Sequence, residues 1–140
     1  MIFERKKYLN ELIAGRGNGL VKIITGVRRC GKSFLLFDIW HNWLLEHGVT
    51  DSHIIEIQLD DFRNRRLRKP DALLDYIDSK VVNDGYPYYI VLDEVQLVEE
   101  FVEVILSLTH MRNVDVYVSG SNSRFLSSDV VTEFRGRGDE

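Results

Sequence analysis

The sequence predicts an α/β fold in which a parallel sheet is covered by helices on both faces. Two observations predict it. Four short apolar runs are rich in β-branched residues, and the segments between them carry apolar residues at helical spacing. Strands that alternate with helices are typical of βαβ units, whose strands run parallel. The chain has 140 residues, of which 44% are hydrophobic and 29% charged, which suits one core and a single domain over residues 1–140.

The strand candidates are short and, in three cases, almost continuously apolar, as expected of strands buried on both faces. They are Val21–Thr25, His53–Leu59, Tyr88–Leu92 and Val114–Val118. The helix candidates carry apolar stripes, and one of them follows Pro70, a residue suited to a first helical turn. They are Glu4–Ile13, Lys32–His47, Asp71–Val82 and Leu97–His110. We expect the two tryptophans of the second helix to belong to the core.

The first strand runs directly into Gly26-Val27-Arg28-Arg29-Cys30-Gly31-Lys32-Ser33, which fits the phosphate-binding pattern G-x-x-x-x-G-K-[ST]. Gly26 and Gly31 permit backbone angles that a Cβ forbids, so the loop can curl with its N–H groups inward. These amides and the start of the next helix form an anion site. We expect Lys32 to bridge the β- and γ-phosphates of ATP and Ser33 to ligate Mg²⁺. The residues expected to contact the nucleotide are Gly26, Val27, Arg28, Arg29, Cys30, Gly31, Lys32, Ser33 and Phe34.

The third strand ends in two carboxylates, Asp93 and Glu94. We expect Asp93 to hold Mg²⁺, mostly through its water shell, and Glu94 to orient and polarise the attacking water. Catalysis is therefore assigned to Glu94, Lys32 and Asp93. One further strand candidate lies between the loop strand and the acid strand, and that insertion separates ATPases with a catalytic glutamate from kinases and GTPases.

The fourth strand runs into polar residues, and the chain ends in arginines. If this strand lies between the loop strand and the acid strand, its carboxyl end faces the γ-phosphate. Ser119, Ser121 and Asn122 are the candidates for sensing that phosphate, with a polar turn that caps a helix as the alternative. Arg135 or Arg137 could stabilise the transition-state charge, from this chain or from a neighbouring subunit, and a solvated tail is equally compatible.

Composition and charge limit the location and the binding partners that can be expected. No apolar run is long enough to span a bilayer and the N-terminus lacks a secretory core, so we expect a cytoplasmic protein without a membrane partner. The single cysteine, Cys30, fits a reducing compartment. Residues 63–69 carry five positive charges and no negative ones in a chain of net charge −4, so the remainder carries −9. Such a cluster can contact nucleic acid, although a solvated loop explains it as well.

Four segments together resemble the AAA-type ATPases of bacteria and archaea that carry a C-terminal domain of poorly understood function. They are residues 21–33, residues 91–96, Gly120-Ser121-Asn122-Ser123, and Phe134-Arg135-Gly136-Arg137-Gly138. The resemblance covers nearly the whole chain and implies a P-loop NTPase fold with strand order 5-1-4-3-2. It also implies that the fifth strand and the C-terminal domain follow residue 140, so that the chain is truncated before the last strand. A homo-oligomer and a DNA partner are left open by it.

The function expected from these features is hydrolysis of Mg-ATP coupled to a conformational change in a larger protein. A nucleotide-occupancy switch or scaffold with negligible hydrolysis, associated with DNA or not, is the alternative. A small-molecule kinase does not need the second acid of the pair. A GTPase would be expected to carry an [NT]-K-x-D motif, which the sequence lacks.

Overall fold

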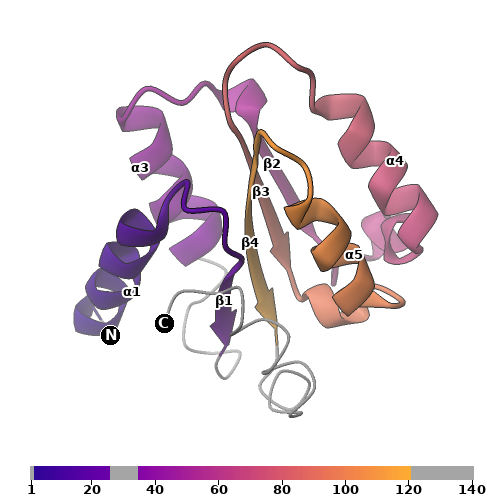
Figure 1. Ribbon diagram of the computed structural model, residues 1–140. Helices are drawn as coiled ribbons and strands as arrows, with labels where there is room; N and C mark the ends of the chain where they lie inside the picture. Colours follow the sequence, from indigo (N-terminus) through magenta and orange to yellow (C-terminus); the bar gives the residue numbers. More distant parts are fainter. Residues whose placement is uncertain (1, 26–34, 121–140) are drawn as a thin grey trace.

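The computed structural model describes residues 2–25 and 35–120, which have the expected α/β architecture. A parallel four-stranded sheet lies between two layers of helices (Figure 1). The strands are β1 (Lys22–Thr25), β2 (Ile54–Gln58), β3 (Tyr88–Asp93) and β4 (Val114–Gly120). The α-helices are α1 (Ile2–Gly15), α3 (His41–Glu46), α4 (Pro70–Lys80) and α5 (Phe101–Thr109). The π-helical turn is η2 (Leu35–Trp40), and the 3₁₀ turns are η3 (Asp51–His53), η4 (Phe62–Arg68) and η5 (Val95–Leu97).

The strand order is β1-β4-β3-β2, so β4 lies between the loop strand and the acid strand, as the family resemblance implied. All three strand pairs are parallel, and the arrowheads in Figure 1 point to one edge of the sheet. At that edge Thr25 pairs with Gly120 and Gln58 pairs with Asp93. The ends of β1, β4 and β3 therefore meet where parallel α/β sheets bind their ligands.

Each face of the sheet has its own apolar core. Ile90 and Leu92 of β3 belong to the core under α4 and α5, whereas Tyr89 and Val91 belong to the core under α1, η2 and α3. Trp40 of η2 is fully buried in this second core. Because successive strand residues point to opposite faces, burial on both sides explains why β3 reads as one continuous apolar run.

One expected helix begins later than its sequence pattern indicates. The pattern predicts Leu97–His110, but α5 begins at Phe101 and Leu97 is 37% exposed. Glu100 has a left-handed backbone conformation (φ 52°), and the Glu99 N–H donates to the Arg68 carbonyl at 2.9 Å. A contact with a distant segment thus replaces the first helical turn. The apolar pattern alone does not reveal this contact.

The bounds of the other helices differ slightly from those predicted from the sequence. Helix α1 is longer than the expected Glu4–Ile13, and α4 ends at Lys80 instead of Val82. In the expected helix Lys32–His47, residues 32–34 lie outside the described residues, and the rest opens with the π-helical turn η2. A π-helix has more residues per turn than an α-helix, and the prediction was based on the α-helical period of 3.6 residues. In the described part of the chain no helix has the length and apolar character needed to cross a bilayer.

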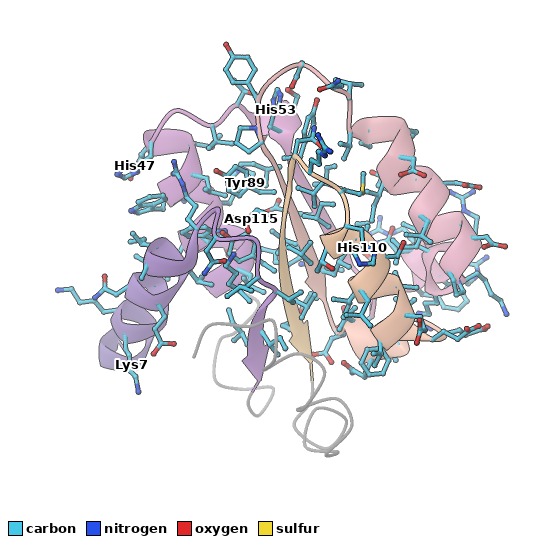
Figure 2. The ribbon with its side chains drawn as sticks, in the orientation of Figure 1. Lys7, His47, His53, Tyr89, His110 and Asp115 are labelled. Atoms are coloured by element: carbon cyan, nitrogen blue, oxygen red, sulfur yellow. The ribbon has the colours of Figure 1, made fainter. Side chains whose placement is uncertain are left out.

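A buried ion pair fixes β1 to β4. Lys22 Nζ lies 2.7 Å from Asp115 Oδ1, and both side chains are almost completely buried. The other carboxylate oxygen of Asp115 accepts hydrogen bonds from the Gly17 N–H (2.8 Å) and from the Tyr117 hydroxyl (2.7 Å). Figure 2 shows Asp115 and Tyr89 between the sheet and the helical layer of α1 and α3. Burial, and then the charge of Asp115, raise the pKa of Tyr117 far above its usual value, so its hydroxyl stays a donor.

Candidate functional site

The two carboxylates predicted to be catalytic lie where β3 ends at the carboxyl edge of the sheet. Asp93 is the last residue of β3 and is 2% exposed, and Glu94 follows it at 5% exposed. The Asp93 carbonyl accepts a hydrogen bond from the Leu59 N–H at 3.1 Å, which ties this end of β3 to the segment after β2. A carboxylate buried to this extent needs polar partners.

Ser119 on β4 supplies such a partner. Its hydroxyl donates a hydrogen bond to Asp93 Oδ1 and accepts one from the Glu94 N–H at 3.2 Å. Ser119 is fully buried and is held in the central part of the sheet between β1 and β3. A serine hydroxyl has a single hydrogen to donate. In this structure that hydrogen is directed to Asp93, which fixes the carboxylate of Asp93 relative to the backbone of Glu94.

Glu94 is held in an unusual backbone conformation. Its φ of 56° and ψ of 49° lie in the left-handed region, which costs a non-glycine residue about 1–2 kcal/mol. The turn η5 follows at once, and Gln96 in it donates from Nε2 to Glu94 Oε1 at 2.7 Å. The chain leaves β3 at this residue, and the hydrogen bond from Gln96 holds one oxygen of the Glu94 carboxylate.

Gln96 was not among the residues that we expected in the site. Its position two residues after the acid pair, at the end of the segment 91–96 that carries the family resemblance, is the signal in the sequence that could have indicated it. That spacing does not predict a contact, because it depends on the left-handed conformation of Glu94.

The predicted phosphate-binding loop follows β1, which ends beside β4 at the same edge of the sheet. Ile24 pairs with Ser119 and Thr25 with Gly120, so Gly26 follows a residue that is paired to the end of β4. Residues 26–34 themselves lie outside the described residues. The described part of the chain brings together only the strand ends from which the two motifs begin.

The residues predicted to sense the γ-phosphate, or to supply an arginine to it, lie partly inside and partly outside the described residues. Ser119 is described and contacts the acid pair, whereas Ser121, Asn122, Arg135 and Arg137 lie outside the described residues. For Mg²⁺, the described residues contain no group of three or more His, Cys, Asp or Glu side chains that could hold an ion. A single buried carboxylate nevertheless fits this ion, because Mg²⁺ prefers oxygen ligands and takes few of them from protein.

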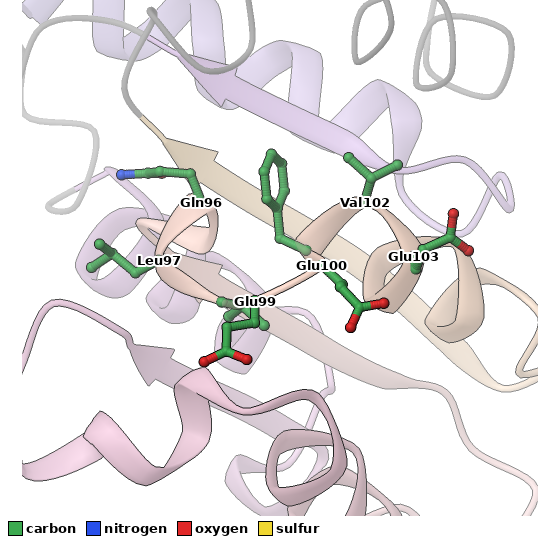
Figure 3. A pocket seen from close by; sticks show the side chains of 8 residues that line it. Gln96, Leu97, Glu99, Glu100, Val102 and Glu103 are labelled. Carbon is green, nitrogen blue, oxygen red and sulfur yellow. The ribbon is translucent and has the colours of Figure 1, made fainter.

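A shallow groove of about 490 Å³ is formed by the segment that follows the acid pair in the sequence (Figure 3). It is lined by one continuous segment, residues 96–103, and carries the carboxylates of Glu99, Glu100 and Glu103. The lining residues include these three carboxylates and no cation, so the groove stays negatively charged and repels a polyphosphate even though Lys69 pairs with Glu99. This groove is therefore unsuited to the triphosphate of ATP, although it lies close to Glu94 in the sequence.

Comparisons with known proteins agree with this architecture. A family described as an AAA domain matches residues 18–140. An uncharacterized protein of Haemophilus influenzae is 29% identical over 136 residues, which cover 97% of this chain and 34% of that protein. A second uncharacterized protein, from Methanocaldococcus jannaschii, is 28% identical over 121 residues, which cover 84% of this chain and 24% of its own length. The chain thus spans about a third or less of these relatives.

Among solved structures, Caenorhabditis elegans PCH-2 has the same fold. It superposes with a TM-score of 0.59 at 18% sequence identity, over 98% of this chain and 39% of that one. At this level of identity the likeness concerns the fold alone. The fold of this chain is therefore an established α/β architecture.

Proposed function

The chain belongs to the AAA domain family and is a nucleotide-binding, ATPase-like domain; from this premise we propose that it binds Mg-ATP through Gly26–Ser33 and hydrolyses it with Asp93 and Glu94. The observation that carries the proposal is the Asp93–Ser119–Glu94 arrangement at the edge of the sheet where β1 ends. It holds two adjacent carboxylates in separate environments. Separate environments allow them to take separate roles.

In this proposal Asp93 helps to hold the metal ion and Glu94 activates the attacking water. The Ser119 hydroxyl holds Asp93 Oδ1, and Gln96 holds Glu94 Oε1, so each carboxylate keeps one oxygen fixed by a neighbour. Asp93 together with Ser33 would hold Mg²⁺, which when bound neutralises charge on the phosphates. Glu94 would accept a proton from the attacking water. Lys32 would bind the β- and γ-phosphates.

The sensor role falls to Ser121 or Asn122 in this proposal. Ser119 already donates its hydroxyl hydrogen to Asp93, so a γ-phosphate would have to compete with a buried carboxylate for it. Arg135 and Arg137 keep their proposed role in stabilising transition-state charge. We further propose that hydrolysis drives a conformational change in a larger protein, since this chain spans only 34% of its Haemophilus influenzae relative.

The test compares two variants of the proposed machinery. Lys32→Ala is expected to abolish ATP binding, because the loop loses the cation that faces the phosphates. Glu94→Gln is expected to bind ATP with unchanged affinity and to release phosphate about 10²–10⁴-fold more slowly, the usual contribution of a general base. Binding is measured with a fluorescent ATP analogue and turnover by phosphate release.

Glu103→Gln is the matched control, because Glu103 is an exposed glutamate on α5. It is expected to turn over like the wild type. Equal turnover by Glu94→Gln and the wild type would rule out Glu94 as the base. Negligible single-turnover hydrolysis by the wild type, with ATP bound, would instead favour the nucleotide-occupancy switch. Phosphate released without any acceptor would exclude a kinase.

A further inference from the structure

The 3₁₀ turn η4 presents an aromatic ring and arginines to solvent. Phe62 is 68% exposed, and the Arg63 side chain is 90% exposed. Arg65 and Arg66 are also exposed, and we call these four residues the basic face. A phenylalanine this exposed is uncommon unless something covers it, since burying its ring is worth about 1.5–3 kcal/mol.

The turn that carries the basic face is anchored after the carboxyl end of β2. Leu67 inserts into the core under α4 and is 8% exposed. The Asn64 side-chain amide donates to the Gln58 carbonyl at 2.9 Å, and Arg68 Nε donates to the Leu59 carbonyl at 2.9 Å. The turn is thus anchored through Asn64, Leu67 and Arg68, which leaves the remaining residues facing outward. A surface that is ordered before binding loses little entropy when a ligand binds.

The arginine beside Phe62 is positioned to strengthen stacking. The Arg65 guanidinium lies over the Phe62 ring, 4.2 Å from its centre, and also donates to the Phe62 carbonyl at 3.1 Å. The ring has two faces, and Arg65 covers one. A planar, electron-rich group can stack on the other face, with phosphates near the arginines.

Charge distribution favours a polyanion at this place. Residues 63–69 carry five positive charges, whereas the rest of the chain carries a net charge of −9. An anionic polymer is therefore attracted to the basic face and repelled by the rest of the chain. Of these five cations, Lys69 is already paired with Glu99 at 2.6 Å and Arg68 anchors the turn through the Leu59 carbonyl, whereas Arg63 contacts Asp61 only at 3.4 Å and is 90% exposed. About three arginines therefore face a ligand.

We propose that the basic face binds single-stranded nucleic acid through about three phosphates and one base stacked on Phe62. A duplex keeps its bases stacked on each other and offers no ring to Phe62, and an acidic peptide supplies charge without a planar base. The exposed side chains of the basic face are a phenyl ring and guanidinium groups, which do not distinguish a 2′-hydroxyl, so DNA and RNA strands bind alike. The basic face shares no residue with the proposed ATP site, and its binding does not depend on hydrolysis.

The test measures binding of fluorescein-labelled oligothymidylate of about 20 nucleotides by anisotropy, without nucleotide present. Phe62→Ala is expected to weaken binding about 5- to 100-fold, the effect of losing one stacked base, and Phe62→Trp to preserve it. The slope of log affinity against log salt between about 50 and 200 mM is expected to be about −2, and Arg66→Ala to make it shallower by about 0.7.

Matched controls separate this proposal from general attraction between charges. Tyr86→Ala removes an aromatic ring that is 66% exposed in the turn before β3, and Arg112→Ala removes an exposed arginine in the turn before β4. Neither variant is expected to change affinity. On an abasic strand, Phe62→Ala is expected to bind like the wild type, because no base is present to stack.

Three results would overturn the proposal: no binding of the strand, equal affinity for single strand and duplex, or no effect of Phe62→Ala on oligothymidylate. Competition by polyglutamate as strong as by oligonucleotide would mean that an acidic protein is the partner instead. Repeating the assay with Lys32→Ala keeps the two proposals apart. Loss of ATP binding there with oligonucleotide binding intact leaves this inference standing by itself.

Discussion

Ser119 is the residue on which the geometry of the acid pair depends. It contacts the side chain of Asp93 and the backbone of Glu94 through one hydroxyl group. Removing that hydroxyl leaves a buried carboxylate and a buried N–H each short of one partner, and a hydrogen bond to a charged group contributes about 1.5–3 kcal/mol. Ser119 is therefore a positioning residue in the proposed reaction.

We predict that Ser119→Ala raises the Mg²⁺ concentration needed for half-maximal ATP hydrolysis about 10- to 100-fold, the usual effect of losing the partner of a metal ligand. The physical reason is that Asp93 loses the contact that orients it. The measurement is a Mg²⁺ titration of phosphate release at fixed ATP. ATP binding without Mg²⁺ should stay unchanged.

Ser107→Ala is the control for this prediction, since Ser107 is an exposed serine on α5. A variant that loses activity by unfolding would lose ATP binding as well. An unchanged Mg²⁺ dependence in a folded Ser119→Ala protein would show that Asp93 does not need its serine.

At the scale of elements, a polar clasp joins the start of β2 to the turn before β3. His53 Nε2 lies 2.7 Å from Asp84 Oδ2, and the same carboxylate accepts hydrogen bonds from the Tyr86 N–H and the Tyr88 hydroxyl. Figure 2 shows His53 at the edge opposite the acid pair. Partial burial raises the pKa of Asp84, but the hydrogen bonds from His53, the Tyr86 N–H and Tyr88 outweigh it and leave that pKa below its usual value.

The clasp predicts a pH dependence of stability with a definite sign. Because the Asp84 pKa is lower in the folded state, its contribution is present above the unfolded-state value of about 3.9 and is lost as the pH falls through the lower folded value. Asp84→Asn should therefore be less stable than the wild type at pH of about 6. The difference should shrink in acid below about pH 3.9. Urea unfolding followed by circular dichroism over this pH range measures it.

Asn83→Ala, a neutral change at the neighbouring exposed position, should follow the wild type at every pH. If Asp84→Asn and the wild type differed in free energy of unfolding by the same amount in acid as at neutral pH, the clasp would stabilise the fold through packing and neutral hydrogen bonds. The ionised carboxylate would then have no part in it.

At the scale of the whole molecule, the Lys22–Asp115 pair connects the strand that leads into the phosphate-binding sequence with the centre of the sheet. It joins β1 to β4, and the Gly17 N–H adds the turn after α1. Both side chains are at most 4% exposed. Breaking a pair this deeply buried leaves an uncompensated charge in the interior.

We predict that Asp115→Ala lowers the free energy of unfolding by about 3–5 kcal/mol, measured by urea denaturation. Adding Lys22→Met should recover part of the lost stability, because it removes the buried positive charge that has lost its partner. The recovery is only partial because the Gly17 N–H and the Tyr117 hydroxyl still lack their acceptor.

The control is Lys69→Ala, which breaks the exposed pair with Glu99. Although the atoms of that pair are 2.6 Å apart, both side chains are more than half exposed, and the change should cost less than about 1 kcal/mol. A comparably small cost for Asp115→Ala would mean that water reaches Lys22.

The strands and the acid pair could be predicted because their signals are local. The unbroken apolar run before Asp93 indicated a strand buried on both faces, and β3 is such a strand. The start of α5 was predicted wrongly, because Glu99 bonds to Arg68, and this contact competes with the apolar period of the helix. Ser119 was named as a candidate for the site, but its contact with Asp93 could not be predicted from the sequence.

The sequence by itself determined the alternation of strands and helices, the phosphate-binding pattern and the position of two acids at a strand end. These follow from spacing along the chain. The strand order, with β4 between β1 and β3, was implied by the family resemblance, and the structure confirms it. Only the tertiary structure decided that Ser119 meets Asp93 and that Lys22 meets Asp115. The partners in these last two contacts are 26 and 93 residues apart in the chain. They depend on strand register, in which a shift of one residue turns every side chain to the other face of the sheet.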